Sequence, residues 1–145
     1  MTSERTLILV PVDFQPASNA ALNAALELSA PLRASIVALH VQDSMFAGPA
    51  ELPTSLVERA PDDERRNLNE SRLQDLCSRF AGIEAMLRTG SPEAEIVRAI
   101  RELSPALVIM GTHGRGGLSR IMLGSVAEYV VMRSPVPVMT IRATK

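Results

Sequence analysis

Lysine is almost missing from this 145-residue sequence: of its 15 lysines and arginines, only Lys145 is a lysine. Apart from that residue, no side chain is available to form a Schiff base with a substrate. The phosphate-binding pattern G-x-x-x-x-G-K-[ST], in which a lysine reaches the phosphates, is also absent. Site classes that are built around an internal lysine are therefore excluded.

Cysteine and aromatic residues are also scarce. Cys77 is the single cysteine, which excludes an intramolecular disulfide, and together with His40 and His113 it is too little for a Cys/His zinc cluster. Aromatic residues make up 3% of the chain and tryptophan is absent, so there is no platform on which single-stranded bases would stack. A net charge of −1 attracts neither nucleic acid nor an anionic membrane surface.

Long apolar runs are missing as well. No run is long enough to span a membrane, and residues 1–12 lack the basic start, apolar stretch and cleavage site of a signal peptide. We therefore expect a cytoplasmic protein. The length, with 46% hydrophobic and 21% charged residues, predicts one globular domain over residues 1–145 that can bury a sizeable core.

Strand-like and helix-like segments alternate along the chain. Short apolar runs predict strands at residues 6–12, 35–41, 83–89, 106–110 and 136–141. Helices are predicted from Pro16, over residues 62–80, from Ser91-Pro92-Glu93 to Ser104-Pro105, and over residues 125–133, because start and stop signals frame periodic apolar residues. Residues 42–61 contain Gly48 and three prolines and are typical of a loop.

Several side chains are expected to fill the core. The inner side of the helix over residues 62–80 is predicted to carry Leu68, Leu73, Leu76 and Phe80, with Cys77 between them. Met110, Met122, Met132 and Met139 are predicted to be core residues too. His40 lies in a strand, where we expect a partly buried histidine with a hydrogen-bond partner.

The alternation predicts an α/β fold, an open Rossmann-like parallel sheet of five strands with helices on both faces. The first, second and fourth strands are almost continuously apolar, as expected when both faces are covered. The third alternates in polarity and the fifth contains Pro137, and both features are typical of edge strands. The predicted order is 3-2-1-4-5, which opens a ligand crevice beyond the first and fourth strands, at Asp13 and Gly111.

A glycine-rich segment follows the fourth strand: residues 111–125 read GTHGRGGLSRIMLGS and lead into a helix. Glycines allow close approach of the backbone to phosphate oxygens, and a helix N-terminus adds partial positive charge. Arg115 and Arg120 could neutralise a polyphosphate, although arginine is the general basic residue of this chain, and Asp13, on the opposite wall, could accept hydrogen bonds from ribose hydroxyls. The sequence therefore predicts a nucleotide site.

Here the chain resembles the universal stress protein family along its whole length. The family's ATP-binding pattern is G-x-x-G, nine residues, then G-[ST], and Gly111, Gly114, Gly124 and Ser125 match it with the spacer intact. The segments VPVDF, ALHV, GTHGRGG and SPVPVMTI are also similar to the family. A lone glycine pattern would be weak evidence, but four matched positions in order and in context are specific.

The resemblance implies a role for each residue. Asp13 would bind ribose, and Pro11 and Val41 would border the adenine. Gly114, Gly124 and Ser125, with the Val126 N–H, would hold the phosphates, accompanied by Mg²⁺ or Mn²⁺. The full predicted set is Pro11, Val12, Asp13, Val41, Met110, Gly111, His113, Gly114, Arg115, Gly124, Ser125 and Val126. The resemblance also implies a homodimer formed through the last strand, residues 136–141.

Structural interpretations compete with these roles. Ser125 and Glu128 form S-x-x-E, the pattern of a capping box, and Asp13 alone is as consistent with capping the first helix or its preceding turn. His113 is either a phosphate contact or a bystander, since no nucleophile–base pair accompanies it. The implied function is an ATP-binding (or ADP- or AMP-binding) dimeric regulator in the stress response. A slow ATPase and a nucleotide-independent interaction module are the alternatives.

Overall fold

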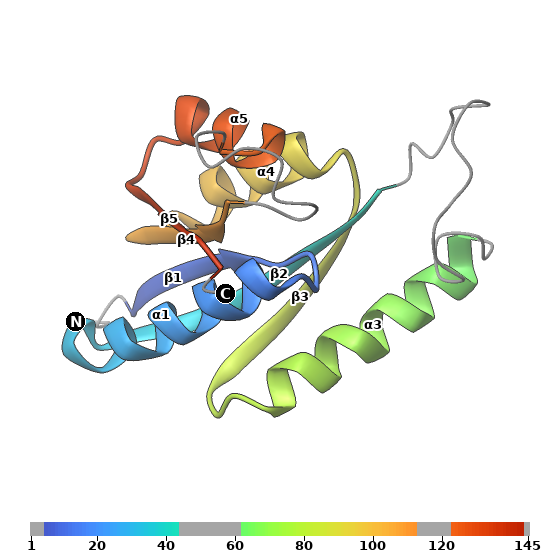
Figure 1. Ribbon diagram of the computed structural model, residues 1–145, viewed down its shortest axis with the longest axis horizontal. Coiled ribbons are helices and arrows are strands. Elements are labelled where there is room, and N and C mark those ends of the chain that lie inside the picture. The colour runs from blue at the N-terminus through green and yellow to red at the C-terminus, as the bar shows by residue number, and fades with distance from the viewer. Residues whose placement is uncertain (1–4, 44–61, 113–122, 144–145) are drawn as a thin grey trace.

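The structure is a computed structural model that describes residues 5–43, 62–112 and 123–143. Its elements, in chain order, are β1 (Thr6–Pro11), α1 (Pro16–Leu32), β2 (Ala34–Asp43), α3 (Asp62–Ser78), β3 (Ile83–Gly90), α4 (Pro92–Leu103), β4 (Leu107–Gly111), α5 (Ser125–Arg133) and β5 (Val138–Ile141) (Figure 1). Strand and helix alternate as predicted. The predicted loop over residues 42–61 begins later than expected because Gln42 and Asp43 continue β2, and residues 44–61 lie outside the described part.

Within these ranges the strands form a five-stranded parallel sheet in the order β3-β2-β1-β4-β5, which confirms the predicted order. β3 and β5 are the edges. Pro137 lies immediately before β5 rather than within it, and its carbonyl oxygen accepts a hydrogen bond from the Val108 N–H at 3.0 Å. A proline is tolerated there because, at a position just before an edge strand, the ladder does not require the N–H that proline lacks.

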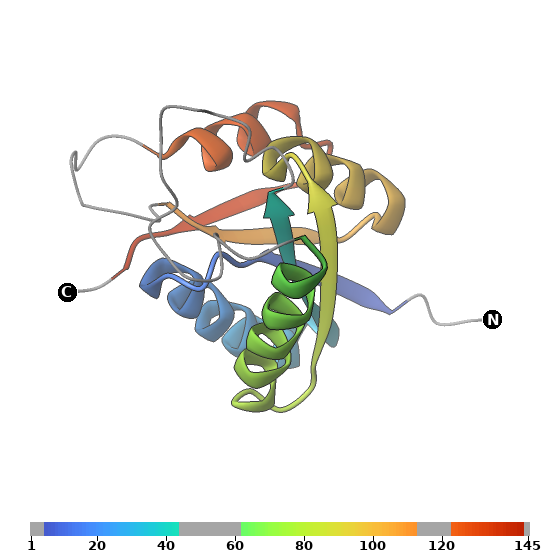
Figure 2. The same ribbon diagram turned by 90° about the vertical axis from the view of Figure 1, so that its right-hand side faces the viewer.

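Helices cover both faces of the sheet, α1 and α3 on one side and α4 and α5 on the other (Figure 2). Successive residues of β1, and Val12 directly after it, face the two layers alternately. Ile8, Val10 and Val12 belong to the core beneath α1 and α3, while Leu9 belongs to the core beneath α4 and α5. This double burial explains why the central strands are continuous apolar runs.

In the described part, no helix is long and apolar enough to cross a membrane.

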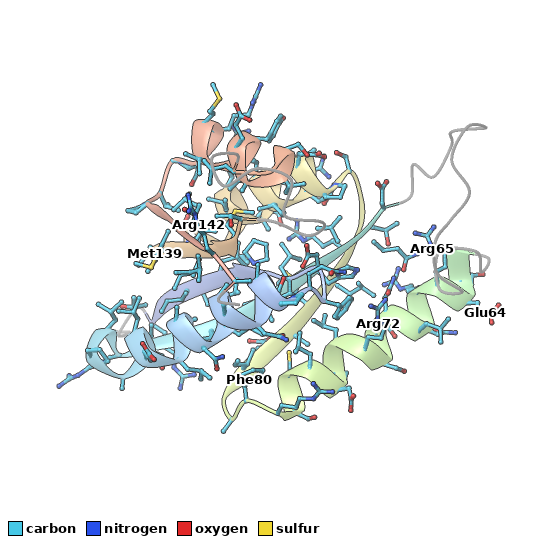
Figure 3. The ribbon with its side chains drawn as sticks, in the orientation of Figure 1. Glu64, Arg65, Arg72, Phe80, Met139 and Arg142 are labelled. Atoms are coloured by element: carbon cyan, nitrogen blue, oxygen red, sulfur yellow. The ribbon has the colours of Figure 1, made fainter. Side chains whose placement is uncertain are left out.

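The helix α3 differs from its prediction. Leu73, Leu76 and Cys77 are buried as expected, but Leu68 is 38% exposed. The inward stripe continues from Leu73 to Asn69 and Arg65, which precede it by one and two helical turns and are both buried. Figure 3 shows Arg65 and Arg72 on the side of α3 that faces the sheet, and Glu64 pointing away.

Those polar residues are buried because the end of β2 offers them polar partners. The Asn69 Nδ2 group donates to Gln42 Oε1 at 3.0 Å, and Arg65 Nη2 donates to the Asp43 carbonyl oxygen at 2.8 Å. Buried polar groups are retained when they are hydrogen-bonded in this way. Hydrophobic periodicity alone pointed to Leu68, which lies off this stripe.

The methionine prediction is correct at one position and wrong at two. Met110 is 4% exposed, but Met132 is 75% and Met139 is 37% exposed, and Met122 lies outside the described residues. Met132 lies on α5 away from the buried residues Ala127 and Val130. Met139 lies on the edge strand β5.

Gly111, the last residue of β4, lies in close contact with α1. A Cβ atom placed on Gly111 would lie 2.6 Å from the Ala17 Cβ and 2.7 Å from the Ala17 carbonyl carbon. Real Cβ atoms essentially never approach other atoms so closely. Glycine is therefore required at this position for packing, independently of any ligand.

We predict that Gly111→Ala lowers the free energy of unfolding by roughly 1–3 kcal/mol, the usual cost of overpacking a tight contact. Urea denaturation followed by circular dichroism measures it. The added Ala17→Gly change should recover only part of the loss, because the backbone of Ala17 still lies too close. Wild-type stability in Gly111→Ala would show that α1 can move away from β4 at no cost.

Candidate functional site

A cavity of about 640 Å³ opens at the carboxyl ends of the central strands. This volume is in the range of small-molecule sites, and its location is where ligands bind in open parallel sheets. All the predicted site residues that the structure describes line it: Pro11, Val12, Asp13, Val41, Met110, Gly111, Gly124, Ser125 and Val126. The predicted residues His113, Gly114 and Arg115, together with Arg120, lie outside the described residues.

Other lining residues were not predicted from the sequence. They are Ala17, Ser18, Leu39, His40, Asp43, Pro92, Ile96, Thr112 and Ala127. Leu39 and Val41 share one face of β2, where they pack with Ile96, Met110 and Ala127 in the core beneath α4 and α5. The cavity therefore has an apolar wall on this side and a polar wall around Asp13.

The carboxylate of Asp13 is held by the turn between β1 and α1. Its Oδ1 accepts hydrogen bonds from the Gln15 N–H at 3.0 Å and from the Ser18 hydroxyl at 2.6 Å. The Asp13 N–H in turn donates to Ser18 Oγ at 2.9 Å. The N-cap of α1 is Gln15, so Asp13 stabilises the preceding turn rather than capping the helix. Within the described part Oδ2 has no partner, which leaves one oxygen of this exposed residue for a ligand.

A stack of three side chains supports the same turn. Phe14 has a left-handed backbone, with φ of 65°, and its ring centroid lies 4.4 Å from that of His40. The guanidinium of Arg72, a residue of α3, lies 4.1 Å from the centroid of the Phe14 ring. Non-glycine residues rarely adopt this conformation, so the stack on Phe14 is part of what holds the strained turn in place.

His40 is partly buried and hydrogen-bonded, as predicted. Its Nδ1 lies 2.8 Å from the Val12 carbonyl oxygen, which can only accept, so Nδ1 carries the hydrogen and Nε2 is unprotonated in the neutral ring. Burial lowers the pKa of His40, with a further lowering by Arg72, while the bond to Val12 and the charge of Asp13 oppose it. The neutral imidazole is therefore favoured.

The far wall is the N-terminus of α5. Gly124 has φ of 67°, and a Cβ on it would lie 2.5 Å from the Thr112 carbonyl oxygen, so a side chain does not fit. The capping box predicted as an alternative is absent: Gly124 is the N-cap, Ser125 is the first helical residue, and no side chain caps the helix. The first N–H groups of α5 thus lack intrahelical partners and favour an anion.

These features fit an adenine nucleotide. The cavity combines an apolar wall, an oriented carboxylate, a glycine cradle and a helix N-terminus. Thr112 Oγ1 is buried there and has no hydrogen-bond partner among the residues that the structure describes. In the described part, no group of three or more histidine, cysteine, aspartate or glutamate side chains is placed to hold a metal ion.

The universal stress protein family model matches residues 5–142 of this chain. The chain belongs to the universal stress protein family. It is 30% identical over 141 residues to the universal stress protein MJ0531 of Methanocaldococcus jannaschii, an alignment that covers 95% of this chain and 82% of that protein. The solved structure of MJ0577 has a TM-score of 0.74 at 23% identity and covers 97% of each chain.

Two other solved universal stress proteins contain nucleotides. One is in complex with cAMP, with 22% identity, a TM-score of 0.64 and coverage of 96% of this chain and 98% of its own. The other, from Arabidopsis thaliana, has AMP bound, with 23% identity, a TM-score of 0.63 and coverage of 96% and 92%. At these identities the likeness establishes the shared fold.

We predict that His40 makes this universal stress protein less stable as the pH falls. Below the ordinary histidine pKa of 6.5 the unfolded chain takes up a proton that the folded chain, with its lowered pKa, refuses. Unfolding free energy from urea titrations should therefore decline from pH 7 towards pH 5, and decline less in His40→Asn, whose amide retains a donor. His113→Asn is the matched control; equal slopes in wild type and His40→Asn would contradict the lowered pKa.

Proposed function

We propose that this universal stress protein binds ATP, or the related ADP or AMP, in the cavity beyond β1 and β4, and acts as a dimeric cytoplasmic regulator. One observation carries the nucleotide proposal. The predicted binding residues come from three strands and one helix that are far apart in the sequence, and all those described line a single cavity. Parallel strands bring these positions to one edge of the sheet, and at that edge the structure has a cavity of about 640 Å³, which is large enough for a small-molecule ligand.

The walls suggest how the nucleotide lies. The adenine would pack against the apolar wall formed by Pro11 and Val41, and the ribose hydroxyls would donate to Asp13. The phosphates would lie at Gly124, Ser125 and the Val126 N–H, where the helix dipole favours negative charge. A bound Mg²⁺ or Mn²⁺ would neutralise phosphate charge and would reach the protein only through those oxygens.

The relatives support the ligand class. The two solved universal stress proteins with cAMP and AMP share an adenine and a ribose, the parts that the apolar wall and Asp13 would receive. They do not distinguish the number of phosphates. The choice of ATP depends on the intact glycine pattern at Gly111, Gly124 and Ser125 and on the predicted contributions of Gly114 and Arg115.

We expect Asp13→Ala to weaken ATP and AMP alike by about tenfold or more, because a hydrogen-bonded charged acceptor for the ribose is lost. Isothermal titration calorimetry measures both affinities. With 2′,3′-dideoxy-ATP, which has no ribose hydroxyls, wild type and variant should bind equally. Asp75→Ala, an exposed aspartate on α3, is the control. A loss confined to ATP would contradict the ribose role, and no binding by wild type would refute the proposed function.

A dimer is proposed through the outer edge of β5, the last strand of the sheet. The Val108 N–H donates to the Pro137 carbonyl and the Thr112 N–H to the Ile141 carbonyl. Since alternate residues of a strand face opposite neighbours, Pro137, Met139 and Ile141 direct their peptide groups to β4, and Val138 and Thr140 direct theirs outward. Two such edges can pair antiparallel, as the family resemblance implies.

Thr140→Pro should therefore convert the dimer to a monomer while the protein stays folded, because it removes an outward N–H and leaves the ladder to β4 intact. Light scattering after size exclusion gives the mass, and circular dichroism reports the fold. Met139→Pro is the contrasting variant and should destabilise the protein, since that peptide faces β4. A monomeric wild type, or a Thr140→Pro variant that remains dimeric, would refute the proposed β5 interface.

A further inference from the structure

A hydroxyl group without a partner lies at the end of β4. Thr112 directly follows Gly111, and its N–H donates to the Ile141 carbonyl oxygen at 3.0 Å, so the backbone of Thr112 is fixed by β5. The residue is 7% exposed, and its Oγ1 is buried with no hydrogen-bond partner in the part of the chain that the structure describes. A buried hydroxyl in this state costs free energy that a ligand oxygen would recover.

Neighbouring polar groups of the cavity do not share this property. The Ser18 hydroxyl donates to Asp13, and the His40 Nδ1 group is bonded to the Val12 carbonyl. These side chains are satisfied within the protein and hold the turn after β1. Thr112 lines the same cavity and contributes a polar group that the fold itself does not use.

The position of Thr112 indicates which part of a ligand it would meet. Its carbonyl oxygen occupies the space that a Cβ of Gly124 would need, so Thr112 packs directly against the N-cap of α5. Anions are favoured at a helix N-terminus. Rotation about the Cα–Cβ bond moves Oγ1 from one staggered position to another, and such a rotamer change would let the hydroxyl turn to the ligand.

We infer that Thr112 is a ligand-contacting residue whose hydroxyl donates a hydrogen bond to a phosphate oxygen of the bound nucleotide. The inference depends on the proposed function and adds a residue at a variable position of the G-x-x-G pattern. It explains why a buried donor at this position has no partner among the described residues: its acceptor would arrive with the phosphate.

The test compares Thr112→Val, which replaces the hydroxyl with a methyl group of similar shape, with Thr112→Ser, which keeps it. Isothermal titration calorimetry is carried out with ATP and with adenosine. Thr112→Val should bind ATP about tenfold or more weakly, the effect of losing a hydrogen bond to a charged group, while Thr112→Ser retains most of the affinity. Adenosine should bind the wild type and both variants equally.

Thermal unfolding of the ligand-free protein separates binding from a structural role. Thr112→Val should melt at or above the wild-type temperature, because an unpaired buried hydroxyl is replaced by an apolar group. A lower melting temperature together with weaker binding of adenosine would assign Thr112 to the fold and overturn the inference. Thr112→Ala provides a second variant without the hydroxyl if valine does not fit.

The remaining outcomes distinguish the two proposals. If wild type binds ATP and Thr112→Val binds it equally well, the hydroxyl is satisfied by water, and the inference fails while the proposed function stands. If wild type shows no ATP binding, both fail.

Discussion

The close approach of α1 to β4 is the contact on which the site depends. No side chain fits between Gly111 and Ala17, so the first turn of α1 lies directly against the end of the strand. This contact fixes the distance between the β1–α1 turn, which carries Asp13 and Ser18, and the residues that follow β4. A second close approach, of Gly124 to the Thr112 carbonyl, places the N-terminus of α5 on the other side. Two glycines therefore set the distance between the walls of the cavity, and their conformational freedom matters only at Gly124, where φ is positive.

The described lining of the cavity contains no lysine or arginine. On these walls the proposed phosphate would therefore be attracted by backbone N–H groups, the Thr112 hydroxyl and the α5 dipole. A helix terminus contributes about 0.3–1 kcal/mol at an exposed site, less than the roughly 1.5–3 kcal/mol of a hydrogen bond to a charged group. Directional donors such as the Val126 N–H therefore outweigh the dipole itself. His40 adds no positive charge to these walls either, because its lowered pKa favours the neutral imidazole, whose Nδ1–H donates to the Val12 carbonyl oxygen.

The sequence predicted the sheet and most of the cavity because both depend on signals that are local and strong. Apolar continuity identified β1, β2 and β4 as central strands, and polarity alternation and Pro137 identified β3 and β5 as edges. Failures arose where a tertiary partner decided the outcome. Hydrophobic periodicity predicts Leu68 on the inner side of α3. It cannot reveal that Gln42 offers a buried hydrogen-bond partner to Asn69, which therefore takes the inward position. The sequence is also consistent with Ser125 as the N-cap of α5, but in the structure Gly124 is the N-cap and Ser125 is the first helical residue. Ser18 matters because its hydroxyl is hydrogen-bonded to Asp13, and Thr112 matters because its buried hydroxyl has no partner among the described residues. Neither property can be recognised from composition or from the spacing of residues.

The placement of β2 shows how the polar contacts complement apolar packing. Apolar side chains hold the middle of β2 between the two helix layers, but its end extends to Asp43 at the mouth of the cavity. There the hydrogen bonds of Gln42 with Asn69 and of the Asp43 carbonyl with Arg65 replace apolar contact. Hydrogen bonds are directional, whereas an apolar surface of similar size would tolerate a shift along the helix. The first half of α3, which has few apolar residues to bury, thereby determines where Val41 and Asp43 stand. A helix that is remote in sequence from the other walls is for this reason part of what shapes the apolar side of the cavity.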